Sequence, residues 1–477
     1  MRLDVFSRRV ALPVSAAEAF AWHERPGALD RLLPPWENVC IASRGEGIRN
    51  GSRVVLINDH GPLRLRWVVE HCDCQQGRQF RDIQIQGPFS HWDHTHRFIA
   101  EGEEASALED YVEYRVPGGI IGRIAAGRLI HRKIGSMFAY RHRTTAADLA
   151  AHARYRRQGA IHVAMTGSHG LIGRELVPLL TTGGHLVTAL VRGEPAHGQV
   201  AWDPEADTFD ASALAGVDGV VHLAGENIAA ARWTEARKQR IRASRVHSTR
   251  ILSAGLARLP SPPKVLVTAS AIGFYGDRGD EILDEDSPAG GGFLARVARD
   301  WEAATEPAAA AGIRVVHLRF GVVLSPKGGA LAKMLAPFKW GGGGVIGSGQ
   351  QYWSWISLAD AAGAIHHALM TDSVCGPVNA VAPDPVTNAA FTKTLGRVLS
   401  RPSVARVPGI AARIAFGEMA DHLLLASTRV QPRRLLDSGY QFRQASLEDA
   451  LRHMLGRTTV RDTSAVCKGP SARSCFL

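Results

Sequence analysis

Residues 1–118 alternate between hydrophobic and polar positions, as strands separated by turns do. The segments SRVVLIND (52–59) and RLRWVVEHC (64–72) show the alternation most clearly. Successive side chains of a strand point to opposite faces, so this period of two predicts a sheet with one buried face.

Two stretches of the same region have a helical pattern instead. Ser15 is followed three residues later by Glu18, which is a capping-box pattern for a short early helix. Further on, four apolar side chains share one face of a long predicted helix: Ile130, Ile134, Met137 and Phe138. We therefore predict an α+β domain over residues 1–153, in which a curved sheet wraps the long helix.

The pattern changes at Ile161, after a polar, basic connector at residues 152–159. Short apolar runs then alternate with amphipathic stretches, and the strand-like runs are IHVAMTG, HLVTALVR, GVVHLAG, KVLVTAS and IRVVHLRFG. Continuous apolar strands separated by helices predict a parallel sheet covered on both faces, here over residues 160–457. The remaining tail, residues 458–477, has no periodicity and is predicted to be disordered.

The first of these apolar runs leads into a glycine-rich turn, MTGSHGLIGRELVPLL (165–180). Gly167 permits a tight turn, Gly170 lets the backbone approach a pyrophosphate, and Gly173 lets the helix pack on the strand. The phosphates would lie over the helix N-terminus, where free N–H groups favour anions. A strand–turn–helix context makes this G-x-x-G-x-x-G pattern a nucleotide-binding prediction rather than a plain turn.

The end of the second apolar run bears on the choice of cofactor. An NAD site uses an acidic residue there for the ribose 2′-hydroxyl, but this run ends in Arg192, with no acidic residue between Glu175 and Glu194. A guanidinium suits a 2′-phosphate, so NADP is favoured over NAD. The alternative is that Arg192 is a solvated surface residue.

Composition excludes several classes of protein. The 477 residues carry a net charge of +11, but the Arg residues are scattered and form no basic stripe interleaved with aromatics, so nucleic acid is not an expected partner. Six Cys in a chain of this length do not make a disulfide framework. Neither a signal peptide nor an apolar run of about 18 residues is present. No membrane span and a cytoplasmic location are therefore expected.

Several separated segments resemble, in order, an atypical subgroup of the extended short-chain dehydrogenase/reductases, related to the NAD-dependent epimerase/dehydratases. They are TGSHGLIG, VVHLAGENIA, RWTEARKQRIRASRVHSTR, DEDSPAGGGFLARVARDWE, LRFGVVLSPKGGAL, GGVIGSGQQYWSWISLAD and GPVNAVAPDPVTNAAF. The segment STRVQPRRLLDSGYQF resembles the family's C-terminal DUF1731-type module, expected at residues 408–457. The resemblance implies a Rossmann-type domain with a small C-terminal substrate lobe.

The same resemblance assigns cofactor roles to individual residues. The pyrophosphate loop is formed by Gly167, Ser168, Gly170, Leu171, Ile172 and Gly173. Leu223 and Ala224 line the ribose, Arg192 meets the adenosine phosphate, and Val323 lies near the nicotinamide. Arg245 either reaches the cofactor from its helix or is a salt-bridged helix residue.

The catalytic assignment departs from the family pattern. A short-chain reductase uses a Tyr as acid and a Lys four residues later, with a Ser that orients the carbonyl. Ser270 matches that Ser, whereas Tyr275 belongs to an additional Tyr-Gly pair, and the helix expected to supply the acid (290–302) contains neither Tyr nor Lys. Three interpretations stay open: Tyr275 acts from a shifted position; a substrate group, a water or Lys327 serves; or NADP is bound with little turnover.

Further candidate substrate contacts occur in the later strand-like segments of the chain. Trp353 and Trp355 either stack on a substrate ring or fill the core. Arg319 ends an apolar strand and pairs with an internal carboxylate or with an anionic substrate.

The N-terminal region resembles the START-like (SRPBCC, cyclase/dehydrase) superfamily, through SAAEAFAWHERPGALDRLLPPW, GPFSHWDHTHRF and the long closing helix. This resemblance implies a helix-grip fold that holds an apolar ligand between sheet and helix. His94 and His96 share one strand face, but two His without a further clustered ligand rarely suffice for zinc, so no metal is assigned.

Together these observations predict an α/β Rossmann-type domain behind an α+β helix-grip domain. The expected function is that of an NADP-binding oxidoreductase or epimerase acting on a small molecule, with Ser270 and Tyr275 as catalytic candidates. The rival interpretation is a non-catalytic NADP-binding sensor or ligand carrier.

Overall fold

The computed structural model describes residues 3–60, 63–206 and 210–458. The chain divides into two compact units, one formed by Met1–Arg154 with Arg452–Leu477 and the other by Tyr155–Leu451. Most of the tail predicted to be disordered, residues 459–477, lies outside the described residues. No helix in the described part of the chain is long and apolar enough to cross a membrane.

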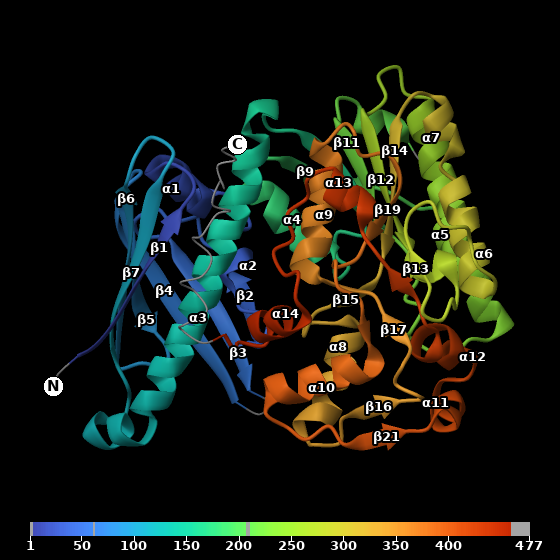
Figure 1. Cartoon of the computed structure of the whole chain (residues 1–477). Coiled ribbons are helices and arrows are strands. Elements are labelled where there is room, and N and C mark those ends of the chain that lie inside the picture. The colour runs from blue at the N-terminus through green and yellow to red at the C-terminus, as the bar shows by residue number, and fades with distance from the viewer. Residues whose placement is uncertain (1–2, 61–62, 207–209, 459–477) are drawn as a thin grey trace, which may run out of the picture. The chain divides into compact units, whose positions relative to one another are not determined.

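The first unit contains a seven-stranded antiparallel sheet in the order β1-β7-β6-β5-β4-β3-β2 (Figure 1). Its strands are β1 (Asp4–Leu12), β2 (Val39–Ser43), β3 (Arg53–His60), β4 (Leu63–Gln75), β5 (Gln79–Gln86), β6 (His91–Ala100) and β7 (Ser106–Arg115). Its helices are α1 (Ala16–Glu24), α2 (Ala28–Leu32) and the long α3 (Gly119–Tyr155), which ends at the first residue of the second unit.

Both helix predictions for this unit are confirmed. Ser15 caps α1, because its hydroxyl accepts the N–H of Glu18 at 3.3 Å. The predicted apolar face of α3 packs on the sheet: Ile134 and Phe138 are buried with Phe6 of β1, and Ile130 and Met137 pack against that cluster. The START-like identity of this unit stays a prediction.

The second unit is built on a seven-stranded sheet in the order β10-β9-β8-β11-β12-β14-β19, with every neighbouring pair parallel. The strands are β8 (His162–Thr166), β9 (Leu186–Val191), β10 (Gln199–Ala201), β11 (Gly219–His222), β12 (Val265–Ala271), β14 (Arg314–Phe320) and β19 (Gly376–Ala380). The prediction of a Rossmann-type parallel sheet is confirmed.

Helices cover both faces of this sheet. On one face, α4 (Gly173–Thr182) and α9 (Leu358–Met370) share a core with residues such as Val163 and Met165 of β8. On the other, α5 (Glu235–Ala257) and α7 (Glu306–Ala310) pack with Ala164 of β8 and Leu266 of β12. The helix α6 (Phe293–Ala303) contacts α5 and β12.

A smaller lobe, built from four two-stranded pairs and short helices, follows the carboxyl ends of the strands (Figure 1). The strand pairs are β13 (Ile282–Leu283) with β22 (Arg429–Val430), β15 (Val322–Leu324) with β18 (Trp355–Ser357), β16 (Gly344–Ile346) with β21 (Ala405–Val407), and β17 (Tyr352–Trp353) with β20 (Val386–Thr387). The helices are α8 (Gly329–Lys339), α10 (Asn388–Leu399), α11 (Gly409–Phe416), α12 (Glu418–Ala420) and α13 (Arg433–Asp437), and α14 (Leu447–Met454) follows near the end of the described chain.

Candidate functional site

The glycine loop between β8 and α4 is closed so tightly that side chains do not fit in it. Gly167 has a φ of +73°, and a Cβ there would lie 2.8 Å from the carbonyl carbon of Leu223. A Cβ on Gly173 would lie 2.3 Å from the carbonyl oxygen of Gly167. Such contacts force the neighbouring backbone to move, so both positions require glycine. The loop therefore has the shape that a backbone-bound pyrophosphate needs at the start of α4.

The rest of the predicted loop lies where the pattern placed it. Gly170 closes the turn, since its N–H donates to the carbonyl of Gly167 at 2.9 Å. Ile172 precedes the first residue of α4, and Ser168 is half-buried. A Cβ on Gly328 would come within 3.2 Å of the Leu171 side chain, so the segment before α8 lies against the loop.

Polar side chains line up across the sheet beside this loop. Thr166, His222, Thr268 and His317 are in register on β8, β11, β12 and β14. Thr166 Oγ1 lies 2.7 Å from His222 Nδ1 and accepts the N–H of Ala224 at 3.3 Å. Burial lowers the pKa of His222 to about 4, so this imidazole is neutral at pH 7. The row fixes the backbone that follows β11 next to the glycine loop.

The predicted adenosine and ribose contacts occupy different environments. Arg192 directly follows β9, the strand next to β8, and its side chain is exposed. Leu223 and Ala224 are half-buried after β11. Arg245 of α5 donates to the carbonyl of Glu226 at 2.9 Å.

The guanidinium of Arg245 also lies over the Trp301 ring, 5.2 Å from its centroid, and burial lowers its pKa to about 10. A Cβ on Gly225 would lie 3.4 Å from the Arg245 guanidinium carbon, so the glycine makes room for it. Among the described residues Arg245 has no ion pair, so the structure does not show the salt-bridged helix residue of the second interpretation. A contact of Arg245 with the cofactor stays a prediction.

Ser270 and Tyr275 belong to one buried hydrogen-bond network. Ser270, Arg319 and Asn379 are in register on β12, β14 and β19. Ser270 donates its hydroxyl to Glu302 Oε1 at 2.7 Å, and Arg319 donates to both Glu302 oxygens at 2.8 Å. Tyr275 donates to Asn379 Oδ1 at 2.7 Å and accepts from Arg319 at 2.9 Å. Of the two interpretations of Arg319, the structure shows the internal carboxylate partner.

Tyr275 is 0% exposed. Burial raises the pKa of its phenol, and the contacts with Arg319 and Asn379 do not offset this effect. A phenol with two protein partners and a raised pKa is poorly placed to donate a proton to a substrate.

The network continues into the C-terminal lobe through Glu285. One oxygen of its buried carboxyl accepts the N–H groups of Asn379 and Arg434 at 3.0 and 3.2 Å. The other oxygen has no hydrogen-bond partner among the described residues, and burial raises the pKa of Glu285. Asn379 also donates to the carbonyl of Gln431 at 3.0 Å. These bonds tie the segment after β22 to the sheet.

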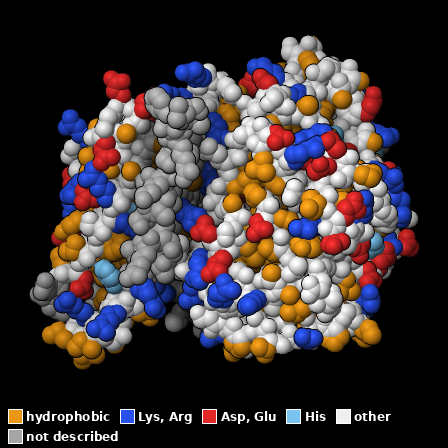
Figure 2. Space-filling view, viewed as in Figure 1, with side chains coloured by type: hydrophobic (Ala, Val, Ile, Leu, Met, Phe, Trp, Pro, Cys, Tyr) orange, Lys and Arg blue, Asp and Glu red, His pale blue; other side chains and the backbone are white. Residues whose placement is uncertain are grey.

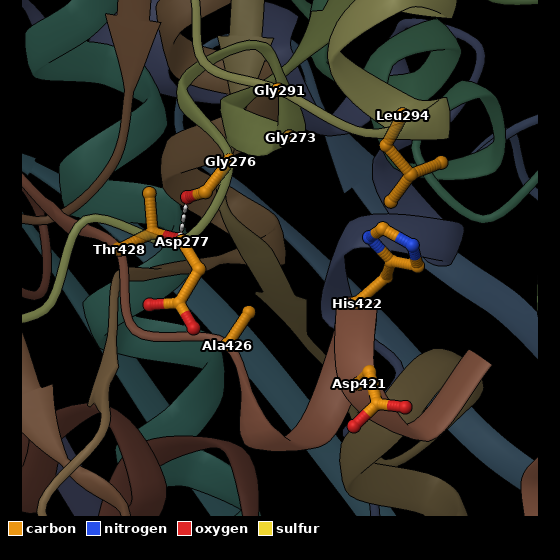
Figure 3. Close-up of a pocket in the computed structure, with 9 residues that line it drawn as sticks. All are labelled: Gly273, Gly276, Asp277, Gly291, Leu294, Asp421, His422, Ala426 and Thr428. Atoms are coloured by element: carbon orange, nitrogen blue, oxygen red, sulfur yellow. Dashed lines mark hydrogen bonds between the residues drawn. The ribbon is translucent and has the colours of Figure 1, made fainter. Parts of the chain in front are cut away.

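A cavity of about 320 Å³ lies between the turn after β12, the start of α6 and the C-terminal segment (Figure 3). It is lined by Gly273, Gly276, Asp277, Gly291, Leu294, Asp421, His422, Ala426 and Thr428. Thr428 donates its hydroxyl to the carbonyl of Gly276 at 3.0 Å, and Asp277 accepts the N–H of Ser427 at 3.1 Å. The Rossmann-type sheet and the C-terminal lobe therefore each supply one wall.

His422 is the imidazole of this cavity, and in Figure 3 its ring lies below the Leu294 side chain. Its ring stacks on Trp233, with centroids 5.6 Å apart, and Trp233 in turn meets Phe293 edge-on. Trp233 belongs to the loop that runs from β11 to α5, so the cavity adjoins the loop that also forms the predicted ribose contact.

The other predicted substrate contacts lie elsewhere. Trp355 is 1% exposed and donates to the carbonyl of Asp384, while Trp353 is 6% exposed and packs on Phe391. Of the two interpretations of these indoles, the structure shows core filling. Lys327 is exposed, and Val323 packs at the edge of the main core.

Charged side chains of both signs are interspersed over the second unit on the face shown in Figure 2. No continuous basic stripe is seen on that face.

The comparisons with known proteins agree with the fold of the second unit. Epimerase family protein Mb2239 of Mycobacterium bovis is 46% identical over 296 residues, which are 62% of this chain and 98% of that protein. The chain belongs to the epimerase family. The NAD dependent epimerase/dehydratase family matches residues 163–380, and the domain of unknown function DUF1731 matches residues 407–454. The predicted family and its C-terminal module are thereby confirmed.

Two crystal structures extend the comparison. The nucleoside-diphosphate sugar epimerase from Corynebacterium glutamicum is 33% identical with a TM-score of 0.79, and the match covers 98% of this chain and 94% of that one. The human epimerase family protein SDR39U1 (isoform2), solved with NADPH, is 36% identical with a TM-score of 0.58. That match covers 62% of this chain and all of the human chain, 100%.

Sequence reasoning missed Glu302, Asn379 and His422. A signal existed for Glu302, because Arg319 at the end of an apolar strand needs a buried partner and the covering helix offers this carboxylate. His422 had no such signal, since only the packing of the C-terminal lobe brings it to the turn after β12.

Proposed function

We propose that the epimerase-family unit binds NADP(H) and interconverts an alcohol and a carbonyl of a small-molecule substrate. The main observation that supports this proposal is the glycine loop, whose backbone leaves no space for a Cβ at Gly167 or Gly173. The human relative solved with NADPH supports the choice of cofactor. When bound, the nicotinamide supplies the hydride donor or acceptor.

Within this proposal, each of the chain's own residues has a limited task. The loop from Gly167 to Gly173 holds the pyrophosphate, and Arg192 meets the 2′-phosphate of NADP. The cavity between the turn after β12 and the C-terminal lobe takes the substrate, with walls shaped by Gly273, Leu294 and Thr428.

We assign the proton transfer to His422. Interconversion of an alcohol and a carbonyl moves one proton, and imidazole is the side chain most often used for this purpose. The first turn of α6 contributes Phe293 and Leu294, which have no proton to give. Tyr275 is buried with both Arg319 and Asn379 on its hydroxyl. Ser270, whose hydroxyl is held by Glu302, then acts as a positioning residue of the turn.

The first test is a titration of NADPH and NADH into the full-length protein, followed by protein fluorescence. In Arg192→Ala, NADPH affinity should fall at least tenfold, about 1.4 kcal/mol, with NADH affinity unchanged. The matched control is Arg258→Ala, which replaces an exposed Arg just after the C-terminal end of α5. This variant should bind NADPH and NADH as the wild type does. Absence of NADPH binding to the wild type would refute the proposal.

A second test addresses turnover. Carbonyl compounds and nucleotide sugars would be screened for NADPH-dependent conversion, and any activity compared in His422→Asn and Tyr275→Phe. The proposal expects the His422 variant to lose activity while it keeps NADPH affinity. Loss confined to the Tyr275 variant would return the acid role to that residue.

The alternative function is a non-catalytic NADP-binding sensor or ligand carrier. The observation that favours it is the lack of Tyr and Lys in α6. NADPH binding without any conversion across the screen would select this alternative.

For the first unit we keep the proposal of a START-like domain that binds an apolar ligand. An antiparallel sheet packed on one long helix supports it.

A further inference from the structure

The inner face of the sheet in the first unit carries an unusual set of polar side chains. His71, Asp82 and His94 are in register on β4, β5 and β6. His96 and Asp110 are in register on β6 and β7, two residues further along the same face. Because alternate residues of a strand share a face, all five side chains point to the same side of the sheet.

These side chains are close together and largely hidden from solvent. Asp82 Oδ2 lies 3.6 Å from His94 Nδ1 and 3.4 Å from His96 Nε2. The side chains of His94 and His96 are 2% and 6% exposed, and that of Asp82 is 17% exposed. The three donor atoms lie within 4.8 Å of one another, so one ion can contact all of them.

The spacing of these atoms is close to the spacing of ligand atoms around a metal ion, although the contact of His96 Nε2 with Asp82 Oδ2 is also a long hydrogen bond. Zinc bonds to nitrogen and oxygen are about 2.0–2.1 Å long, which places neighbouring ligand atoms roughly 3.0–3.4 Å apart around the ion. The two Asp82–imidazole distances, 3.4 and 3.6 Å, are at or beyond the limit of a hydrogen bond. A small shift of the side chains would bring all three atoms to ligand distance.

The opposite nitrogens of the two imidazoles are also engaged. His94 Nε2 lies 2.9 Å from Asp110 Oδ1, and His96 Nδ1 lies 2.7 Å from the same oxygen. The second oxygen of Asp110 contacts His142 of α3 at 2.5 Å. A carboxylate behind a ligating imidazole fixes its tautomer and orientation, which is the usual outer partner of a metal-binding His. For His94 this contact is a hydrogen bond, whereas the contact of His96 Nδ1 with Asp110 does not have hydrogen-bond geometry.

Several buried atoms of the cluster lack a hydrogen-bond partner of good geometry among the described residues. They are Oδ1 of Asp82 and Nδ1 of His71, His96 and His142. Although His71 Nδ1 is 2.5 Å from Asp82 Oδ1, the contact does not have hydrogen-bond geometry. Buried polar atoms without partners are costly, so the cluster is not satisfied by its own side chains alone.

We propose that Asp82, His94 and His96 bind one divalent first-row transition-metal ion, with Asp110 positioning the imidazole of His94. Two imidazoles and a carboxylate suit zinc or ferrous iron, and leave coordination positions open. His71, whose Nδ1 lies 2.5 Å from the other oxygen of Asp82, is a further potential donor. The proposal concerns the first unit alone and does not depend on the proposed NADP chemistry of the second.

The test uses the full-length protein after treatment with a chelator. Cobalt(II) would be titrated in, and bound metal measured by elemental analysis after gel filtration. The wild type should bind one equivalent, with a visible d–d absorption band from nitrogen and oxygen ligands and a higher melting temperature. Asp82→Asn and His96→Gln should each weaken cobalt binding at least tenfold.

The matched control is His91→Gln on the outer face of β6. His91 belongs to a separate group with Asp93 and Glu113, so this variant reports on that group. It should bind cobalt as the wild type does. Loss of binding in this variant with retention in Asp82→Asn would overturn the assignment.

Folding of the variants would be checked by circular dichroism. Should His96→Gln not fold, Asp82→Asn and the wild-type absorption band still decide the question. Less than one-fifth of an equivalent bound by the folded wild type, or cobalt binding without a d–d band, would refute the site. The cluster would then be a buried ion-pair network.

Discussion

Glu302→Gln tests whether the network beneath the candidate site depends on charge. In the folded protein, the Glu302 carboxylate accepts two hydrogen bonds from Arg319 at 2.8 Å and one from Ser270 at 2.7 Å. The Arg319 side chain is 4% exposed and that of Glu302 13% exposed. The substitution keeps the shape of the side chain but leaves the Arg319 guanidinium buried with no carboxylate beside it.

The magnitude follows from this burial. Two unit charges 4 Å apart attract by about 4 kcal/mol at an effective dielectric constant near 20. Removal of one partner from a buried pair typically costs about 3–5 kcal/mol, and we expect Glu302→Gln to lower the free energy of unfolding by this amount. Glu281→Gln breaks a pair between Glu281 and Arg278 whose side chains are 49% and 23% exposed. The cost of that substitution should stay below about 1 kcal/mol.

Differential scanning calorimetry would measure the unfolding of both variants. Because the chain has two compact units, hydrogen exchange of α6 and β14 would show which transition contains Glu302. The double variant Glu302→Gln/Arg319→Met should recover part of the loss, since it removes both charges. The reasoning is refuted if Glu302→Gln and Glu281→Gln destabilise the protein equally.

Three further predictions follow from the structure. Gly173→Ala should weaken NADPH binding in the fluorescence titration at least tenfold, about 1.4 kcal/mol, because its Cβ would lie 2.3 Å from a backbone oxygen. The control is Gly342→Ala, whose Cβ would meet nothing closer than 3.6 Å and which should bind NADPH as the wild type does. His222 has a folded pKa of about 4 against 6.5 for free histidine, so its contribution to stability is complete above pH 6.5 and is lost as the pH falls towards 4. Between pH 7 and pH 4, the melting temperature of His222→Gln should therefore fall less than that of the wild type. An equal fall for both proteins would contradict the assignment. Asp148→Asn removes a buried carboxylate that accepts hydrogen bonds from Arg31 at 2.7 and 2.8 Å, and it should lower the free energy of unfolding of the first unit by about 3–5 kcal/mol. Asp30→Asn, which breaks a more exposed pair with Arg44, should lower it by less than about 1 kcal/mol. Equal losses for the two variants in calorimetry would count against the argument.

The period of hydrophobic positions in the sequence was sufficient to predict the main sheet and the long helix of the first unit, and the parallel sheet of the second. The long helix α3 packs on the sheet through the face that carries Ile134 and Phe138. The parallel strands after Ile161 occur where the sequence has continuous apolar runs. Burial on one or two faces of a strand imposes a pattern that is local in sequence, so it can be read without a structure. The glycine loop is local in the same sense, because the turn at Gly167 and the close approach at Gly173 each need a residue without a Cβ.

Three groups of side chains depend on contacts between separate segments of the chain. The partner of Arg319 is Glu302 on a covering helix, and the imidazole in the cavity is His422 of the C-terminal lobe. In the first unit, His94 and His96 have no further ligand on their own face of β6, whereas strand register places Asp82 and Asp110 on that face.

The sequence by itself therefore determined the main strands and helices, the order of the two units and the nucleotide loop, because each depends on spacing within one segment. Only the tertiary structure decided which side chains meet in the buried network, the cavity and the His–Asp cluster. Pairing of strands and docking of lobes bring together residues that no local period connects.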